Sequence, residues 1–343
     1  MWLFLPGGAN MSGSTVSADV LCLRPEADFR EVGVQPPGEL VIRFDAGPDE
    51  VPDADLAAAR AVVLASVGPA LDRAWADRAA RVELVQFTGA GVDRGAAAFA
   101  GRPGVVVANV PAANAREVAE YVLLGTGSVL RGLALADREI RACRYREVRG
   151  RLTPAAVRSL HSATVGVVGL GQIGLAVARL FRAAGAQVGY SDPAPRDPAA
   201  ATALGLGRLD LGELLAGSDV VTLHVPLAPA TRGLIGPAEL GRMRPGAVLV
   251  NASRGGVVDE AALAAALEDG HLGGAVLDVY AQEPPLAGSP LLTLSPAASD
   301  RVLYTPHIAG VAYEAARRLY SEAWANVRRV LVDGLPAENG VGS

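Results

Sequence analysis

Lysine is absent from this 343-residue chain, and all 31 of its basic residues are arginines. Chemistry that needs a lysine amine or ammonium is therefore excluded, including Schiff bases, pyridoxal aldimines and Walker-type phosphate loops. Only two cysteines occur, Cys22 and Cys143. Two cysteines provide neither a disulfide framework nor a metal-ligand spacing. They fit a reducing compartment, so we expect a cytoplasmic protein.

Histidine is also scarce, and no two of the four histidines stand at metal-ligand spacing, so no metal site is expected. The net charge is −5, which gives no basic field for nucleic acid or anionic lipid. No uninterrupted apolar run reaches membrane-spanning length. We expect neither a nucleic acid nor a membrane as partner.

The chain contains 50% hydrophobic and 20% charged residues, an ordinary balance for a globular protein, and its length suggests about two domains. Residues 1–16 contain a short apolar run followed by Gly and Ser, without the basic region of a signal peptide. We expect a flexible tail there, with Met11 as a second candidate start.

From residue 164 onward, short β-branched runs alternate with helical patterns, as in "TVGVVG" followed by "IGLAVARLFRAA". Such alternation predicts a parallel sheet covered by helices on both faces. Residues 17–113 repeat the pattern on a smaller scale. The sequence therefore predicts an α/β protein with two Rossmann-like, doubly wound parallel-sheet domains separated by a cleft.

A long helical pattern starts near Asn114, and a second one covers residues 312–331. We expect the first to lead from one domain into the other and the second to return to the N-terminal domain. The predicted organisation is a substrate-binding domain of residues 17–113 plus 309–335, a dinucleotide-binding domain of residues 114–308, and a C-terminal tail of residues 336–343.

The glycines of "GLGQIG", Gly169, Gly171 and Gly174, stand between a predicted strand and a predicted helix, and Asp192 ends the next strand. Gly169 allows the tight turn, Gly171 lets the backbone approach a pyrophosphate, and Gly174 lets the helix pack on the strand. The helix N-terminus then offers N–H groups to the phosphates. Asp192 would bind the ribose hydroxyls and repel a 2′-phosphate, which favours NAD.

Arg254, Glu283 and His307 each follow a predicted strand, so they belong to the carboxyl edge of the sheet, where ligands bind in such folds. The planar fork of an arginine can hold a carboxylate, which a lysine could not copy in the same way. A histidine can act as a general acid, and a glutamate can orient that histidine and favour its charged form.

The sequence resembles the D-isomer-specific 2-hydroxyacid dehydrogenases over nearly its whole length. The segments that carry the resemblance are "GAGVD" (89–93), "NVPAANAREVAEY" (109–121), "VGVVGLGQIG" (165–174), "DVVTLHVPLAPATRGLI" (219–235), "MRPGAVLVNASRGGVVDEAAL" (243–263), "GAVLDVYAQEP" (274–284) and "TPHIAG" (305–310). It implies an NAD-dependent, homodimeric enzyme that interconverts a small-molecule 2-oxo acid and a (2R)-hydroxy acid.

By that resemblance Arg254, Glu283 and His307 match the catalytic residues, and Asp278 matches an acid near the nicotinamide carboxamide. In "TGAG", the N–H groups of Ala90 and Gly91 would bind the substrate carboxylate together with Arg254 and His307. His224 is expected to form a wall of the adenosine pocket. The expected cofactor-binding residues are Gly169, Gly171, Gln172, Ile173, Gly174, Asp192, His224, Val225, Pro226, Ala252, Ser253, Arg254, Asp278, His307 and Gly310.

The sequence departs from the family in three places. Tyr121 stands where the family often has His, Val311 and Ala312 stand where Thr or Ser is frequent, and "CRYREVRGRL" replaces the usual Gly-x-Trp segment. These departures concern the substrate or dimer contacts. Only residues 308–343 follow His307, which leaves no room for the regulatory domain of longer phosphoglycerate dehydrogenases.

Three other activities are possible on this fold. A formate dehydrogenase is disfavoured, because that branch has Gln at the position of Glu283. A phosphite-type dehydrogenase and a non-catalytic, NAD-sensing corepressor-like protein can both keep the Arg–Glu–His set, and fold alone does not separate them.

Overall fold

The computed structural model describes residues 17–45, 47–154 and 156–341. The expected N-terminal tail of residues 1–16 and the candidate start at Met11 lie outside these residues. The chain divides into two compact units: unit 1 contains Met1–Pro111 and Tyr320–Ser343, and unit 2 contains Ala112–Leu319. The division near the C-terminus falls inside one helix, α14 (Tyr313–Leu331), eleven residues or so after the boundary expected at 309.

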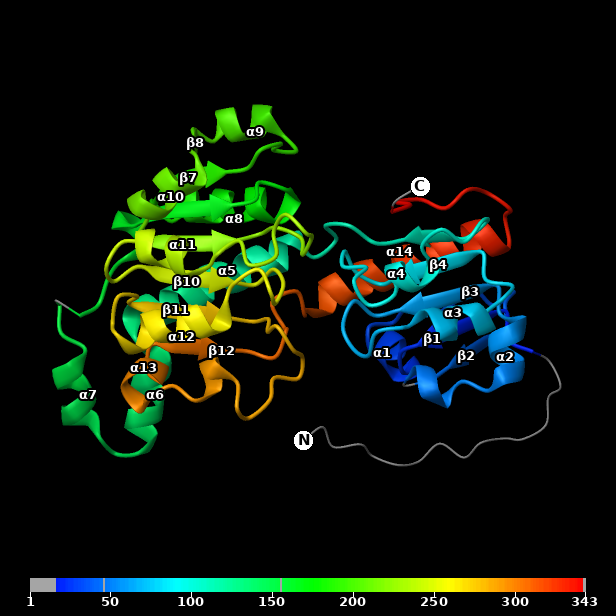
Figure 1. The fold of residues 1–343 in the computed structure, drawn as a ribbon, viewed down its shortest axis with the longest axis horizontal. Helices are drawn as coiled ribbons and strands as arrows, with labels where there is room; N and C mark the ends of the chain where they lie inside the picture. Colours follow the sequence, from blue (N-terminus) through cyan, green and yellow to red (C-terminus); the bar gives the residue numbers. More distant parts are fainter. Residues whose placement is uncertain (1–16, 46, 155, 342–343) are drawn as a thin grey trace. The chain divides into compact units, whose positions relative to one another are not determined.

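Unit 1 is built on a five-stranded sheet of order β2-β1-β3-β4-β5, in which every neighbouring pair is parallel. Short helices connect the strands (Figure 1). Its elements are β1 (Val20–Leu23), α1 (Glu26–Glu31), β2 (Ile42–Phe44), η1 (Pro48–Glu50), α2 (Asp53–Ala58), β3 (Ala61–Leu64), α3 (Arg73–Arg78), β4 (Leu84–Phe87), α4 (Ala96–Phe99) and β5 (Val106–Ala108).

The C-terminal part of α14 packs on one face of this sheet. Its Trp324 ring lies 5.4 Å from the ring of Phe29, and its Asn326 donates to the buried amide oxygen of Gln86 at 2.6 Å. Asn326 also exchanges hydrogen bonds with the backbone of Glu338. Helix α14 and the segment after it are thereby fixed to the sheet.

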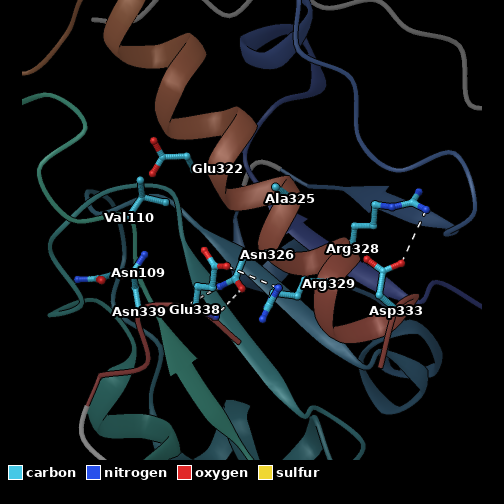
Figure 2. Close-up of a pocket in the computed structure, with 10 residues that line it drawn as sticks. All are labelled: Asn109, Val110, Glu322, Ala325, Asn326, Arg328, Arg329, Asp333, Glu338 and Asn339. Carbon is cyan, nitrogen blue, oxygen red and sulfur yellow. Dashed lines mark hydrogen bonds and ion pairs between the residues drawn. The ribbon is translucent and has the colours of Figure 1, made fainter. Parts of the chain in front are cut away.

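The described part of the expected C-terminal tail, residues 336–341, runs beside the edge strand β5. Gly340 pairs with Ala108 in antiparallel fashion, and the Val341 N–H donates to Val107. Figure 2 shows Asn339 beside Asn109 at this edge. This pairing covers backbone groups that an edge strand would otherwise leave open.

Unit 2 is built on a seven-stranded parallel sheet of order β12-β11-β10-β9-β6-β7-β8. The strand order reverses at β6, which has β7 on one side and β9 on the other. Its strands are β6 (Thr164–Val168), β7 (Gln187–Ser191), β8 (Gly207–Arg208), β9 (Val220–Leu223), β10 (Val248–Asn251), β11 (Gly274–Leu277) and β12 (Val302–Tyr304).

Helices cover both faces of this sheet (Figure 1). Besides the N-terminal part of α14, the helical elements of unit 2 are α5 (Ala115–Arg131), α6 (Leu133–Arg141), α7 (Tyr145–Arg151), η2 (Leu160–Ser162), α8 (Gln172–Ala183), α9 (Pro198–Ala203), α10 (Leu211–Gly217), α11 (Pro237–Arg242), α12 (Glu260–Glu268), η3 (Pro290–Leu292) and α13 (Pro296–Ser299).

The two cores of unit 2 follow from the alternation of side chains along each strand. In β10, Val248 and Val250 join the core under α5 and α8, while Leu249 joins the core under α10, α11 and α12. Because both faces are buried, the strands read as continuous apolar runs. The fold class predicted from the sequence is confirmed.

Candidate active site

The glycine turn lies between β6 and α8, at the point where the strand order of unit 2 reverses. Gly169 has φ +89°, and a Cβ there would lie 2.6 Å from the carbonyl oxygen of His224. A Cβ on Gly174 would lie 2.0 Å from the oxygen of Gly169. Both positions therefore require glycine, one for backbone conformation and the other for close packing of helix and turn.

Gly171 has a different environment. A Cβ built there meets no described atom within 4 Å, and no described side chain caps the N-terminus of α8, where Gln172 and Ile173 begin the helix. Open space in front of uncapped N–H groups is the arrangement that accepts a phosphate group. The turn therefore fits the pyrophosphate of a dinucleotide.

Asp192 is tied to the glycine turn directly. One carboxylate oxygen accepts the N–H of Leu170 at 2.6 Å, and the other accepts the N–H of Ala194 at 2.7 Å. The sequence predicted only a role toward ribose for this acid. An ionised carboxylate has about four lone-pair positions, so these two bonds leave acceptor capacity for hydroxyl groups.

Glu283 and His307 form a hydrogen-bonded pair, with Nδ1 of His307 2.8 Å from Oε2 of Glu283. The side chain of His307 is 27% exposed and that of Glu283 is 32% exposed, so both reach solvent. Oε1 of Glu283 accepts the N–H of Tyr280 at 3.1 Å, which fixes the carboxylate. The geometry of the pair suits an oriented acid–base histidine.

Partial burial raises the pKa of Glu283, but opposing interactions outweigh it and the net pKa is lowered. Those interactions are the hydrogen bond and charge of His307, the N–H of Tyr280 and the charge of Arg254. All three residues singled out from the sequence lie on loops at the carboxyl edge of the sheet of unit 2, since Arg254 follows β10, Glu283 follows β11 and His307 follows β12.

The loop that carries Arg254 is shaped by Asn251, at the end of β10. The side chain of Asn251 donates to the carbonyl of Arg254 at 3.0 Å and accepts from the N–H and hydroxyl of Ser253. A Cβ on the next residue, Gly255, would lie 1.8 Å from the carbonyl oxygen of Tyr280. The loops after β10 and β11 are thus in direct backbone contact, and the sequence analysis did not identify Asn251 as their organiser.

Asp278 is fully buried and holds the turn of residues 305–309. Its carboxylate accepts the hydroxyl of Thr305 at 2.6 Å and the N–H groups of Ile308 and Ala309, both at 2.8 Å. Its backbone oxygen accepts the N–H of His307 at 2.8 Å. This anchoring role, beside the predicted place near the nicotinamide, could not be read from the sequence.

His224 directly follows β9 and is partly buried, with its Nδ1 shielded from solvent. Burial lowers its pKa from 6.5 to about 3, so it is neutral at physiological pH. Its Nε2 pairs with the hydroxyl of Thr222 at 2.8 Å, and Nδ1 has no partner among the described residues. A neutral, partly buried ring fits the predicted wall and not a proton donor.

The remaining predicted residues of unit 2 lie in the loops already described. Val225 and Pro226 follow His224, and a Cβ on Gly169 would touch the side chain of Val225 at 2.8 Å. Ala252 and Ser253 precede Arg254. Gly310 follows the His307 turn, where a Cβ would lie 2.2 Å from the side-chain nitrogen of Asn114. Close packing against Asn114 therefore explains why position 310 is a glycine.

Ala90 and Gly91 belong to unit 1, in the loop after β4. The Val110 N–H donates to Gly89, and the Asn109 side chain donates to the carbonyl of Ala90 at 2.7 Å. Within the described residues, the N–H groups of Ala90 and Gly91 donate to no protein acceptor. A pair of consecutive unpaired N–H groups is a feature that can bind an anion.

A pocket of about 420 Å³ lies elsewhere in unit 1. Figure 2 shows it between α14 and the loop at Asn109, where charged side chains pair with one another around it, as in the contact between Arg328 and Asp333. None of the residues predicted for catalysis or cofactor binding lines it.

The described residues contain no group of three or more His, Cys, Asp or Glu side chains that could hold a metal ion. Among the same residues, no single helix is long and apolar enough to cross a membrane, and only the bent pair α5 and α6 meets that criterion jointly, by length and composition.

Comparison with known proteins identifies the sequence family. Residues 126–309 match the family model described as D-isomer specific 2-hydroxyacid dehydrogenase, NAD binding domain. A D-3-phosphoglycerate dehydrogenase of Mycobacterium tuberculosis is 35% identical over 299 residues, covering 85% of this chain and 53% of that protein. The chain thus spans about half the length of the curated relatives it matches first.

Other similar proteins act on different substrates. A (S)-sulfolactate dehydrogenase of Chromohalobacter salexigens is 41% identical over 221 residues, which is 64% of this chain and 67% of that protein. A structure of D-lactate dehydrogenase from Aquifex aeolicus, complexed with NAD and lactic acid, has a TM-score of 0.81 at 25% identity and covers 94% of this chain and 99% of that one. A pyruvate reductase of Chlamydomonas reinhardtii has a TM-score of 0.76 at 30% identity, with 94% and 98% covered.

Proposed function

The chain belongs to the D-isomer specific 2-hydroxyacid dehydrogenase family, and on that premise we propose that it interconverts a 2-oxo acid and a (2R)-hydroxy acid with NAD. The observation that carries the proposal is the Glu283–His307 pair at 2.8 Å, with the charge of Arg254 acting on the same carboxylate. These groups lie on loops at the edge of the sheet that also carries the glycine turn.

Each side chain has a distinct task in this proposal. His307 gives its proton to the ketone oxygen during reduction and removes it from the hydroxyl during oxidation. Glu283 accepts a hydrogen bond from Nδ1 of His307 and stabilises the charged ring. Nε2 is then the nitrogen that faces the substrate. Arg254 binds the substrate carboxylate through its planar guanidinium.

The glycine turn and the uncapped N-terminus of α8 would hold the pyrophosphate, and Asp192 would accept the ribose hydroxyls. When bound, the nicotinamide supplies or takes up the hydride. We propose a preference for NADH over NADPH, because a 2′-phosphate beside the carboxylate of Asp192 would add electrostatic repulsion. An equal or higher kcat/KM with NADPH would contradict this preference.

Ala90 and Gly91 are proposed to bind the substrate carboxylate through their N–H groups. Replacement of Gly91 by proline removes one of these donors. We expect KM for the 2-oxo acid to rise several-fold, as for loss of a charge-assisted hydrogen bond, while the Kd of NADH stays unchanged. An unchanged KM in a folded variant would exclude this N–H from the site.

The proposed reaction is tested by following NADH oxidation with a panel of 2-oxo acids: glyoxylate, pyruvate, hydroxypyruvate, and bulkier aliphatic and aromatic acids. The panel should include phosphohydroxypyruvate and sulfopyruvate, because dehydrogenases for a phosphorylated and a sulfonated hydroxy acid are among the similar proteins. We expect turnover with at least one acid and loss of most of it in His307→Ala. NADH binding without turnover of any acid would instead support an NAD-sensing protein.

We further propose that the chain forms a homodimer through α6 and α7, which Figure 1 shows at one end of unit 2, together with the exposed side of α5. Large apolar side chains are exposed there: Leu124 at 72%, Tyr145 at 64%, Leu133 at 55% and Ile140 at 47%. Burial of such side chains against a second copy is favourable. Sedimentation velocity should give a dimer for the wild type and a monomer for Leu124→Glu combined with Ile140→Glu.

The matched control carries the same charge change at Leu209, a residue of unit 2 that is 40% exposed on another segment. Leu209→Glu should remain a dimer. A monomeric wild type at tens of micromolar, or dissociation caused equally by the control, would contradict the proposed interface.

A further inference from the structure

His307 has a backbone conformation that is costly for any residue with a side chain. Its φ is +57°, in the left-handed region, where the Cβ of an L-residue approaches the following carbonyl oxygen. Such conformations persist where surrounding contacts determine them. The turn that carries the histidine must therefore be held from outside, and the contacts that hold it decide where the imidazole lies.

The first of these contacts come from Asp278, which accepts the N–H groups on both sides of the turn. The His307 N–H bonds to its backbone oxygen, and the N–H groups of Ile308 and Ala309 bond to its carboxylate. Asp278 is fully buried, so these bonds form without competition from water. The remaining donor to the carboxylate is the hydroxyl of Thr305, at 2.6 Å.

Thr305 is in turn held by two tyrosines from different elements. The hydroxyl of Tyr121, on α5, lies 2.5 Å from Oγ1 of Thr305, and the hydroxyl of Tyr280 donates to the carbonyl of Thr305 at 3.0 Å. Burial raises the pKa of both tyrosines to about 12, so both hydroxyls keep their protons in the working pH range.

The direction of these hydrogen bonds follows from the number of protons that each group can donate. Thr305 has one hydroxyl proton, and a carboxylate can only accept, so that proton goes to Asp278. The proton of Tyr121 must then point at Thr305. The result is an ordered chain from Tyr121 through Thr305 to Asp278, which removes the rotational freedom of the threonine hydroxyl.

We propose that Tyr121 is a positioning residue for His307, acting through Thr305 and Asp278. The catalytic part of this inference depends on the proposed function, whereas its structural part does not. Tyr121 stands where related sequences often have His, and its hydroxyl provides a proton to Thr305 irrespective of pH. A neutral histidine in its place would donate or accept according to its tautomer.

The first measurement is amide hydrogen exchange at Ile308 and Ala309 in the free protein. Tyr121→Phe should accelerate exchange at both amides by about 3- to 10-fold, the effect of losing one buried hydrogen bond. The matched control is Tyr304→Phe, because Tyr304 lies next to Thr305 and its hydroxyl donates to Leu291 at 2.7 Å, outside the Asp278 network. The control should leave exchange at 308 and 309 unchanged.

The second measurement is single-turnover hydride transfer. Tyr121→Phe should lower its rate by about 3- to 10-fold while KM for the 2-oxo acid and Kd for NADH change by less than about 2-fold. Thr305→Ser should keep most of the rate, because it retains the hydroxyl. Thr305→Val should lose more, and adding Tyr121→Phe to Thr305→Val should cost little, since the chain is already broken.

The outcomes separate the two proposals. Unchanged exchange at Ile308 and Ala309 in Tyr121→Phe overturns the positioning role, whatever the enzyme does. So do additive effects of Tyr121→Phe and Thr305→Val on the rate, or a rate loss that Tyr304→Phe reproduces. Faster exchange in a chain whose wild type turns over no 2-oxo acid refutes the proposed function and leaves the structural network in place.

Discussion

His224 should remain neutral far below the pH at which an exposed histidine takes up a proton. Burial lowers its pKa from 6.5 to about 3, because an enclosed imidazolium loses its hydration. Nδ1 has no described partner that could accept a second proton, and Nε2 already pairs with Thr222. We therefore expect a pH-dependent stability of unit 2 that is traceable to this one ring.

The sign and size follow from the two pKa values. Between about pH 6.5 and 3 the unfolded chain binds a proton at His224 and the folded chain does not, so the free energy of unfolding falls as the pH drops. Near and above pH 6.5 the penalty vanishes. At pH 5 the distance from the unfolded pKa is about 1.5 units, which corresponds to about 2 kcal/mol.

Two measurements on wild type and His224→Gln test this. With only four histidines in the chain, imidazole NMR should show one ring, absent from the variant, that stays neutral from pH 8 to 5. Urea unfolding should be followed at amides of β9, because Trp75 and Trp324 belong to unit 1 and would not report on unit 2. From pH 8 to 5, wild type should lose about 2 kcal/mol more stability than His224→Gln.

His271→Gln is the matched control, because it removes a histidine at another place in unit 2, where Nε2 of His271 lies 3.1 Å from the carbonyl oxygen of Leu240. It should keep the pH dependence of the wild type. If the resonance that His224→Gln removes titrates near pH 6.5, or if the variant loses as much stability as the wild type, the assignment of a neutral buried ring is wrong.

Three further predictions concern the site. Arg254→Lys keeps the charge but loses the planar fork, so the transition state should lose about 2 kcal/mol or more of stabilisation, measured as a lower kcat/KM in steady-state kinetics. A kcat/KM near that of the wild type would show that Arg254 does not bind the substrate. Glu283→Gln should move the pH at which the single-turnover rate of reduction is lost to a lower value, because the lowered pKa of Glu283 keeps a negative charge beside His307 at neutral pH. The rates of wild type and variant should converge as the pH falls below the pKa of Glu283. Identical pH–rate profiles would show that this charge does not influence the proton transfer. Gly171→Ala should fold normally but weaken NADH binding in a fluorescence titration, since its Cβ enters space free of described atoms. Gly174→Ala should instead lower the free energy of unfolding by about 1–3 kcal/mol, because its Cβ lies 2.0 Å from the Gly169 oxygen. Equal stability of the two variants would contradict the packing argument.

The sequence by itself determined the fold class, because strands and helices of this chain have clear local periodicities. The apolar runs of β6, β9, β10 and β11 are buried on both faces, and that burial is what makes them continuous. The glycine turn was also readable, because Gly169 and Gly174 meet steric requirements that only glycine satisfies. The resemblance to the 2-hydroxyacid dehydrogenases, which rested on ordered motifs along the chain, is confirmed.

The candidate catalytic residues were predictable for a topological reason. Carboxyl ends of parallel strands meet at one edge of a sheet, so loops distant in the sequence had to converge there. The structure shows Glu283 in contact with His307, and it brings the loop that carries Arg254 against the loop after β11. The catalytic roles of Arg254, Glu283 and His307 stay predictions, as do the functions of the predicted cofactor-binding residues and of Ala90 and Gly91.

Only the tertiary structure decided how these residues are held. Nothing in the local sequence indicates that Asp278 anchors the turn of His307, or that Asp192 binds the N–H of Leu170. The link from Tyr121 to Thr305 joins residues 184 positions apart. Periodicity reports which face of an element is buried, but a hydrogen bond between side chains depends on the register and spacing of elements that packing brings together.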